Sequence, residues 1–220
     1  MKVILTTDAS GAATAGSLGM VVMVVDVIDF STSMEAAIDE GAAAVFGACP
    51  DKSMPPVKIN PYIIGAMAGR KAKQIGSAVV VLAEPRVGSD DERLKDISKA
   101  LTGVCSAEAE IEAVIPNLGA EIPRLINLKG KVVLGATGSG GVVFDAAVCA
   151  GAPAVLTGTV ARTLKKNGFV SARDSAGRTI SEANRLGTGI AVVAASGNSL
   201  EDILAAEYLY KTIMQRLRLE

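Results

Sequence analysis

Two short loops carry the side chains that are best suited to chemistry. The first begins with Asp26-Val-Ile-Asp29 after an apolar run and continues into the hydroxyl cluster Ser31-Thr32-Ser33. The second, Gly135-Ala-Thr-Gly-Ser-Gly-Gly141, also follows an apolar run. Carboxylate oxygens suit a Mg²⁺ ion, whereas glycine N–H groups at the start of a helix suit a phosphate or a sulfonate. The two loops therefore predict a site for a metal ion and a small anion.

Further charged residues follow other apolar runs. Glu84 and Arg86 come soon after the run 78–82, and Glu201 follows Gly197-Asn-Ser199. An arginine can bind a phosphate or sulfonate through two parallel hydrogen bonds. A Mg²⁺ ion held by carboxylates can neutralise a phosphate ester and activate water for in-line attack. This set of residues favours hydrolysis of a phosphate ester.

Each of these motifs also has a structural interpretation. Asp29 and the hydroxyl cluster are typical of helix caps, and the glycine-rich loop lacks the lysine of a P-loop and fits a tight connection from strand to helix. Glu201 and Asp202 follow a serine in the pattern of a capping box, which explains Asp202 and leaves Glu201 free. Asp26 is harder to explain, because an unpaired carboxylate at the end of an apolar strand is costly to bury.

Composition narrows the classes of function. The chain contains no histidine, which excludes Ser-His-Asp and Cys-His nucleophilic machinery and histidine zinc sites in their usual forms. A net charge of -1 and 3% aromatic residues argue against nucleic-acid binding, which needs a basic surface and aromatic rings for stacking. Cys49, Cys105 and Cys149 lack CxxC spacing and are interpreted as reduced packing residues.

Nothing in the sequence predicts a membrane location. The apolar run 18–25 is far shorter than the roughly 20 residues that span a bilayer. The N-terminal segment has no basic region followed by an apolar stretch and a cleavage site. We expect a cytoplasmic protein without a membrane or nucleic-acid partner, whose ligand is a small anionic metabolite. A homo-oligomer remains open.

Short apolar runs rich in Val, Ile and Leu alternate with helical patterns along the chain. The runs are continuous and bounded by glycine or small polar residues, as in strands that are buried on both faces. They lie at 3–5, 20–25, 43–46, 78–82, 132–134, 154–156 and 190–193. Helices are predicted at 32–41, 61–74 and 199–217, each with a capping signal at its start. This alternation predicts a single α/β domain, 1–220, of layered α/β/α type with a largely buried, parallel or mixed sheet.

The two halves of the chain resemble each other. A shift of 110 positions without a gap lays 22–46 on 132–156 and matches Gly41-Ala42 with Gly151-Ala152. We predict an internal duplication with halves of about 1–110 and 111–220. In open parallel sheets, ligands bind beyond the carboxyl ends of the strands. The acidic and the glycine-rich loops are expected at matching ends of this kind.

The order of these motifs resembles that of the 2-phosphosulfolactate phosphatase family, over most of the chain. The family motif Asp-Val-Leu-Arg-Ala-(Ser/Thr)-Thr-Thr is similar to Asp26-Val-Ile-Asp-Phe-Ser-Thr-Ser33. The family motif Gly-Glu-Arg-x-Gly is similar to 83–88 with a proline inserted, and Ser-x-Glu-Asp appears at 199–202. The resemblance implies a Mg²⁺-dependent phosphatase that hydrolyses 2-phospho-3-sulfolactate in coenzyme M biosynthesis.

Two departures mark the chain as a divergent member. Asp29 and Gly140 stand where the family has arginines that are expected to bind the doubly anionic substrate. An aspartate in place of an arginine turns attraction of an anion into repulsion. The alternative hypothesis is therefore a non-catalytic small-molecule-binding or assembly protein on the same scaffold.

Together, the residues and the resemblance lead to one assignment of roles. Asp26 and Glu84 are predicted to hold Mg²⁺, and Glu201 is predicted to orient water or the metal, so these three form the catalytic set. The predicted substrate-binding residues are Asp29, Ser31, Thr32, Ser33, Arg86, Thr137, Gly138, Ser139 and Gly140. The predicted activity is Mg²⁺-dependent hydrolysis of a small phosphorylated acid.

Overall fold

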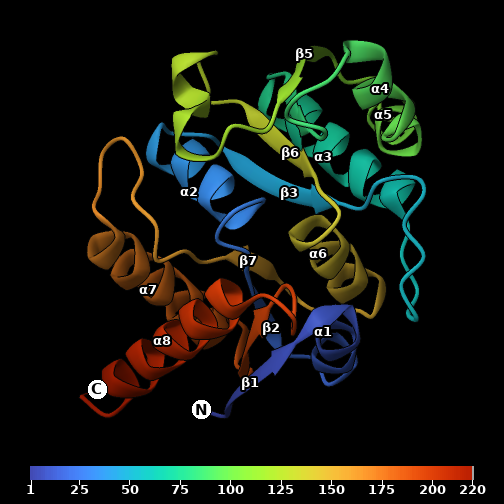
Figure 1. The fold of residues 1–220 in the computed structure, drawn as a ribbon. Coiled ribbons are helices and arrows are strands. Elements are labelled where there is room, and N and C mark those ends of the chain that lie inside the picture. The colour runs from blue at the N-terminus through green and yellow to red at the C-terminus, as the bar shows by residue number, and fades with distance from the viewer. Residues whose placement is uncertain (220) are drawn as a thin grey trace.

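A computed structural model describes residues 1–219, whose strands form two four-stranded parallel sheets. The order is β1-β8-β2-β7 in sheet A and β3-β6-β4-β5 in sheet B. Figure 1 shows β1, β2 and β7 of sheet A below β3, β5 and β6 of sheet B. The predicted α/β class and layered fold are confirmed. The strands are β1 (Val3–Thr7), β2 (Val21–Val25), β3 (Ala44–Ala48), β4 (Val79–Ala83), β5 (Ile111–Pro116), β6 (Val132–Ala136), β7 (Val155–Thr157) and β8 (Ile190–Ala194).

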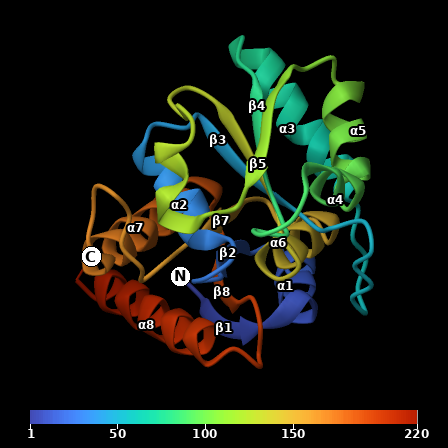
Figure 2. The ribbon, with the colours of Figure 1, turned by 45° about the horizontal axis from the view of Figure 1, so that its top comes forward.

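Helices cover both faces of each sheet, and the two sheets share the layer of helices between them. Helices α7 and α8 cover the outer face of sheet A, whereas α3 and α5 cover the outer face of sheet B, at the opposite end of the molecule (Figure 2). Helices α1, α2 and α6 and the 3-10 helix η1 fill the space between the sheets. The helices are α1 (Asp8–Ser17), α2 (Ser31–Asp39), α3 (Pro61–Ile75), α4 (Asp90–Lys95), α5 (Ser98–Ser106), η1 (Gly119–Arg124), α6 (Gly140–Cys149), α7 (Gly168–Leu186) and α8 (Leu200–Leu217).

The two halves of the chain are interleaved. Sheet A takes β1 and β2 from the first half and β7 and β8 from the second, and sheet B takes the remaining strands. When each strand is exchanged for its counterpart in the other half, the strand order of sheet A becomes that of sheet B. Neither half forms a sheet by itself. The correspondence is one of topology, and its origin in a duplication stays a prediction.

Two glycines at matching positions end the central helices in the same way. Gly41 after α2 has φ 88° and Gly151 after α6 has φ 89°. This left-handed conformation is favourable for glycine because it has no Cβ. The Gly-Ala pairs that align in the sequence therefore mark equivalent turns, from which the chain enters β3 and β7.

The predicted helices are present, although one of the predicted caps is wrong. Asn60 accepts the N–H of Ile63 at 3.2 Å and caps α3 as expected. Thr32 does not begin a capping box: α2 starts one residue earlier, without a side-chain cap. The reason is that the Thr32 hydroxyl donates to the carbonyl oxygen of Val27 at 2.6 Å, so it is committed to the preceding loop.

None of the helices within residues 1–219 combines the length and the apolar character that crossing a bilayer requires.

Candidate functional site

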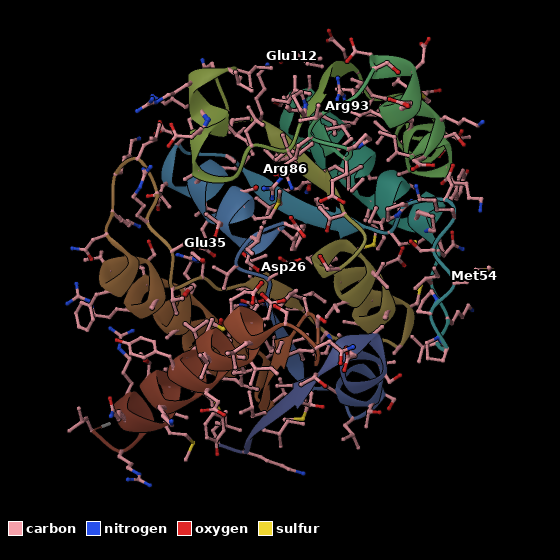
Figure 3. The ribbon with its side chains drawn as sticks, in the orientation of Figure 1. Asp26, Glu35, Met54, Arg86, Arg93 and Glu112 are labelled. Atoms are coloured by element: carbon pink, nitrogen blue, oxygen red, sulfur yellow. The ribbon has the colours of Figure 1, made fainter. Side chains whose placement is uncertain are left out.

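The two loops predicted to carry chemistry lie against each other. We call residues 26–29, after β2, the acid loop and residues 137–141, after β6, the glycine loop. Asp26 Oδ2 accepts hydrogen bonds from the Ser139 hydroxyl and from the Gly140 N–H, both at 2.6 Å. Because β2 belongs to sheet A and β6 to sheet B, this contact joins the carboxyl ends of the two sheets. In Figure 3, Asp26 lies near the middle of the molecule.

Asp26 is buried, with 2% of its surface exposed, and its carboxylate is well supplied with donors. Besides the two bonds to the glycine loop, Oδ1 accepts the N–H of Asp29 at 2.8 Å. Ser31 fixes the backbone beneath it: its hydroxyl oxygen accepts the Asp26 N–H at 3.0 Å and donates to the Val24 carbonyl at 2.8 Å. These hydrogen bonds compensate for the desolvation of the carboxylate. Asp26 therefore caps α6 and shapes the acid loop.

Asp29, Glu84 and Arg86 form a second charged group beside this contact. Arg86 Nη2 donates to Asp29 Oδ1 at 2.7 Å and to the Ile28 carbonyl at 2.6 Å. Glu84 Oε2 accepts the Gly138 N–H at the longer distance of 3.4 Å. Asp29 comes from sheet A and Glu84 from the end of β4 in sheet B, so the charged group also bridges the sheets.

The carboxyl groups of Asp29 and Glu84 are both harder to ionise than free carboxyl groups. Burial raises the pKa of Glu84, and the negative charge of Asp29 raises it further. Burial likewise raises the pKa of Asp29, as does the charge of Asp26, whereas Arg86 opposes this rise. A positive ion between the two carboxylates would relieve their repulsion. Their position is thus favourable for a cation.

A cavity of about 650 Å³, which we call cavity 1, opens in front of these groups. Asp29, Glu84 and Arg86 lie on its wall together with Gly138 of the glycine loop. Lys52 and Lys95 add positive charge to the lining, and Lys52 forms an ion pair with Asp96. Cavity 1 therefore brings together carboxylates and cations, the two kinds of group that a metal ion and a phosphate need.

The hydroxyl residues predicted to bind substrate have partners within the protein. Thr32 lies 2.8 Å from the Thr159 hydroxyl, and Ser33 donates to the side chain of Asn117. Thr137 accepts the Gly141 N–H at 2.8 Å and so closes the turn of the glycine loop. All three predicted residues are buried. In this structure they hold the loops in place.

Gly140 has a steric reason to be glycine. A Cβ at this position would lie 2.5 Å from the Phe30 Cβ and 2.7 Å from Asp26 Oδ2. An arginine side chain at this position would not fit without rearrangement. At Gly138, by contrast, a Cβ would meet no atom within 4 Å.

At the start of α8 the buried acid is Asp202, and Glu201 is exposed. Asp202 Oδ1 accepts the N–H of Val27 in the acid loop at 2.9 Å. Burial raises the pKa of Asp202 to about 6, and the charge of Asp26 adds to the rise. The capping box predicted here is half formed, because the Ser199 hydroxyl accepts the Asp202 N–H but the Asp202 carboxylate turns to the acid loop.

Sequence reasoning missed two residues that position the acid loop. Asp202 shares the buried face of α8 with Ala205, Ala206 and Leu209, and this helical spacing is the signal that was available. Asn117 follows β5, and its side-chain amide donates to the Asp29 carbonyl while its oxygen accepts from Ser33. No motif marks Asn117, because β5 itself was not predicted.

A metal held by protein groups alone is not indicated. Within residues 1–219, no three Asp, Glu, Cys or His side chains come together in a way that could hold an ion. Mg²⁺ is usually bound through one or two carboxylates and completes its shell with waters and substrate phosphate oxygens. The donor set of Asp29 and Glu84 fits that mode of binding.

Comparison with protein-family models gives no match for this chain, and comparison with curated proteins gives none that is significant.

Proposed function

We propose that this protein is a Mg²⁺-dependent phosphatase of small phosphorylated acids, related in its site to the 2-phosphosulfolactate phosphatases. One observation carries the proposal: two carboxylates whose pKa values are raised, Asp29 and Glu84, lie beside Arg86 on the wall of cavity 1. The missing histidine is consistent with it, because hydrolysis through a metal-activated water needs no histidine.

In this proposal Asp29 and Glu84 would hold the ion. Asp26 was predicted from the sequence as a metal ligand, but its carboxylate already accepts three hydrogen bonds. Its role is to hold the acid loop against the glycine loop. A bound Mg²⁺ neutralises phosphate charge and lowers the pKa of a coordinated water.

Residues around the ion would bind and orient the substrate. Arg86 and Lys95, both on the wall of cavity 1, supply positive charge for the phosphate and the acid group. Arg86 is tied to the acid loop through Asp29 and the Ile28 carbonyl, so substrate and ion would meet at a fixed point. Asn117 and Asp202 hold the Asp29 carbonyl and the Val27 N–H, respectively, and keep the loop in that position.

Assays of phosphate release with and without Mg²⁺, on a panel of small phosphorylated acids, test the proposal. We expect Glu84→Gln and Asp29→Asn to lower Mg²⁺-dependent turnover by about 100-fold or more, since loss of even an outer partner of a metal costs 10–100-fold. Glu110→Gln is the matched control, because Glu110 is exposed and precedes β5 at the opposite end of sheet B. Absence of any Mg²⁺-stimulated turnover in the parent protein contradicts the proposal.

A second function is favoured by a different observation. The N–H groups of Gly138, Gly140 and Gly141 donate to Glu84, Asp26 and Thr137, so protein oxygens already occupy the places predicted for a phosphate. A non-catalytic small-molecule-binding protein would show this arrangement if the chemistry had been lost. It predicts binding of a phosphorylated acid to cavity 1 by calorimetry, without turnover and without dependence on Mg²⁺.

A further inference from the structure

A second cavity, which we call cavity 2, lies beside the first. It has a volume of about 830 Å³ and is formed at the carboxyl ends of β1 and β8, between α1 and α6. Pockets of this size enclose whole drug-sized ligands, so it exceeds what a three-carbon acid requires. Its polar lining consists of Thr6, Thr7, Asp8, Ser10, Thr14, Ser139 and Ser196.

The lining of cavity 2 is rich in hydroxyl groups and contains no lysine or arginine. Its one carboxylate is engaged: Asp8 Oδ1 accepts the Gly197 N–H at 2.9 Å, and Oδ2 accepts the Thr7 hydroxyl at 2.5 Å. The phosphate of a substrate would find no positive partner among these side chains. Cavity 2 therefore suits the uncharged part of a ligand.

The hydroxyls offer both donors and acceptors. Ser196 Oγ accepts the Asn198 N–H at 3.2 Å, which leaves its own proton to donate. Ser139 donates to Asp26 at 2.6 Å, which leaves its lone pairs to accept. A hydroxyl group of a ligand donates and accepts in the same way, so a chain of hydroxyls matches this lining.

The glycine loop forms the boundary between the two cavities. Gly138 lines both of them, and the space where its Cβ would lie is open to at least 4 Å. The loop after β3 also borders both, through Lys52 and Ser53 in cavity 1 and Pro55 and Pro56 in cavity 2. Between them, Met54 is 94% exposed and points outward (Figure 3). Gly138 is thus the shared wall over which a ligand that occupies both cavities would pass.

We propose that cavities 1 and 2 form one bipartite site, in which cavity 1 binds the phosphate and cavity 2 binds a neutral polyhydroxylated chain. The substrate class is then the phosphate monoester of a sugar derivative with several free hydroxyls. This inference rests on the proposed phosphatase function for the position of the phosphate. The hydroxyl subsite itself rests on the lining of cavity 2 and on the shared wall at Gly138.

Two polyol phosphates of different length test the inference: glycerol 3-phosphate and sorbitol 6-phosphate. Ser10→Phe places an aromatic ring in cavity 2 from an exposed position on α1. We expect it to lower the ratio of kcat/KM for sorbitol 6-phosphate to that for glycerol 3-phosphate by about tenfold, the scale of a lost pocket contact. Ser17→Phe, an exposed serine on the same helix outside the lining of cavity 2, is the control and keeps the parent ratio.

Thr14→Phe fills the same cavity from the next turn of α1 and gives the same selective loss if Ser10→Phe fails to fold. An unchanged ratio in the folded variants overturns the inference, because cavity 2 would then not hold the longer chain.

Failure of the phosphatase function itself would appear as no turnover by the parent protein of these two esters or of any phosphorylated acid in the panel, whereas turnover of the phosphorylated acids alone overturns the inference. Binding of sorbitol 6-phosphate, measured by saturation-transfer NMR without Mg²⁺, then decides the question. Loss of the signal in Ser10→Phe and its retention in Ser17→Phe support the hydroxyl subsite, and equal signals in both overturn it.

Discussion

Asp26 and Gly140 are 114 positions apart in the chain, yet the carboxylate of one accepts the N–H of the other at 2.6 Å. The acid at the end of a strand in sheet A thereby caps a helix that follows a strand in sheet B. Negative charge at a helix N-terminus is favourable because the free N–H groups and the helix dipole point toward it. One side chain thus links the two sheets at the edge where the candidate site lies.

Removal of this link is expected to destabilise the fold. Asp26→Ala leaves the Gly140 and Asp29 N–H groups and the Ser139 hydroxyl without their acceptor. We expect the free energy of unfolding in urea to fall by about 2–4 kcal/mol. Asp26→Asn keeps the shape and one acceptor oxygen and is expected to lose less. A loss below about 0.5 kcal/mol, as for a typical surface change such as Glu110→Ala, would contradict the capping role.

Gly138 and Gly140 of the glycine loop are expected to respond differently to an added methyl group. In Gly140→Ala the new Cβ meets Phe30 at 2.5 Å, and we expect a loss of about 1–3 kcal/mol from overpacking. In Gly138→Ala the Cβ points into open space, and the change is expected to stay within about 0.5 kcal/mol. Urea unfolding of the pair measures both. Equal losses of stability in the two variants would show that both positions need the conformational freedom of glycine, and that the contact with Phe30 is not the cause.

Much of the fold was predictable because its strands are buried on both faces. Such strands appear in the sequence as continuous apolar runs. Seven of the eight strands in residues 1–219 coincide with predicted runs. The missing one, β5, is an edge strand beside β4, and the exposed Glu112 interrupts its apolar pattern. The split into two sheets was not predicted. The sequence feature that could have indicated two sheets is α6. Its residues are apolar nearly all round, as suits a helix that lies between two sheets.

The convergence of the acid and glycine loops was also predictable, because both follow strands that belong to similar halves. The detailed roles were not. Which carboxylate meets which N–H depends on how the two sheets pack across the helices between them, and no local pattern records it. Asp26 therefore looked like a free metal ligand in the sequence, whereas in the structure Asp29 and Glu84 lie on the wall of cavity 1.

Asp202 is expected to make stability depend on pH. Its pKa rises from 3.8 to about 6 in the folded protein, mainly through burial, so the folded state binds this proton more tightly than the unfolded chain does. The stabilisation from this bound proton is fully present below the pKa of Asp202 in the unfolded chain. It is lost as the pH rises through about 6, the pKa of Asp202 in the folded protein. Asp202→Asn keeps an acceptor for the Val27 N–H but cannot ionise.

We expect Asp202→Asn to gain up to about 3 kcal/mol relative to the parent as the pH rises from about 4 to 7. Free energies of unfolding in urea at several pH values, compared between the two proteins, measure this difference. Parallel curves across that range would mean that Asp202 titrates alike in the folded and unfolded states.

The ion pair of the buried Glu35 and the half-buried Arg178 is expected to be the costliest contact to break. Glu35 on α2 is 2% exposed, and it accepts the Thr157 hydroxyl at 2.8 Å in addition to the Arg178 guanidinium on α7 (Figure 3 marks Glu35). Burial raises the pKa of Glu35, and Arg178 opposes the rise. Arg178→Met leaves the buried carboxylate uncompensated, which costs about 3–5 kcal/mol at neutral pH.

The loss in free energy of unfolding caused by Arg178→Met is expected to be smaller at low pH. Without the guanidinium the pKa of Glu35 rises further, so a protonated and uncharged Glu35 relieves the penalty as the pH falls. Unfolding in urea at pH 5 and pH 8 measures the difference, and Arg173→Met, an exposed arginine on the same helix, is the control. A cost that is small or independent of pH would show that water or another group replaces Arg178 beside Glu35.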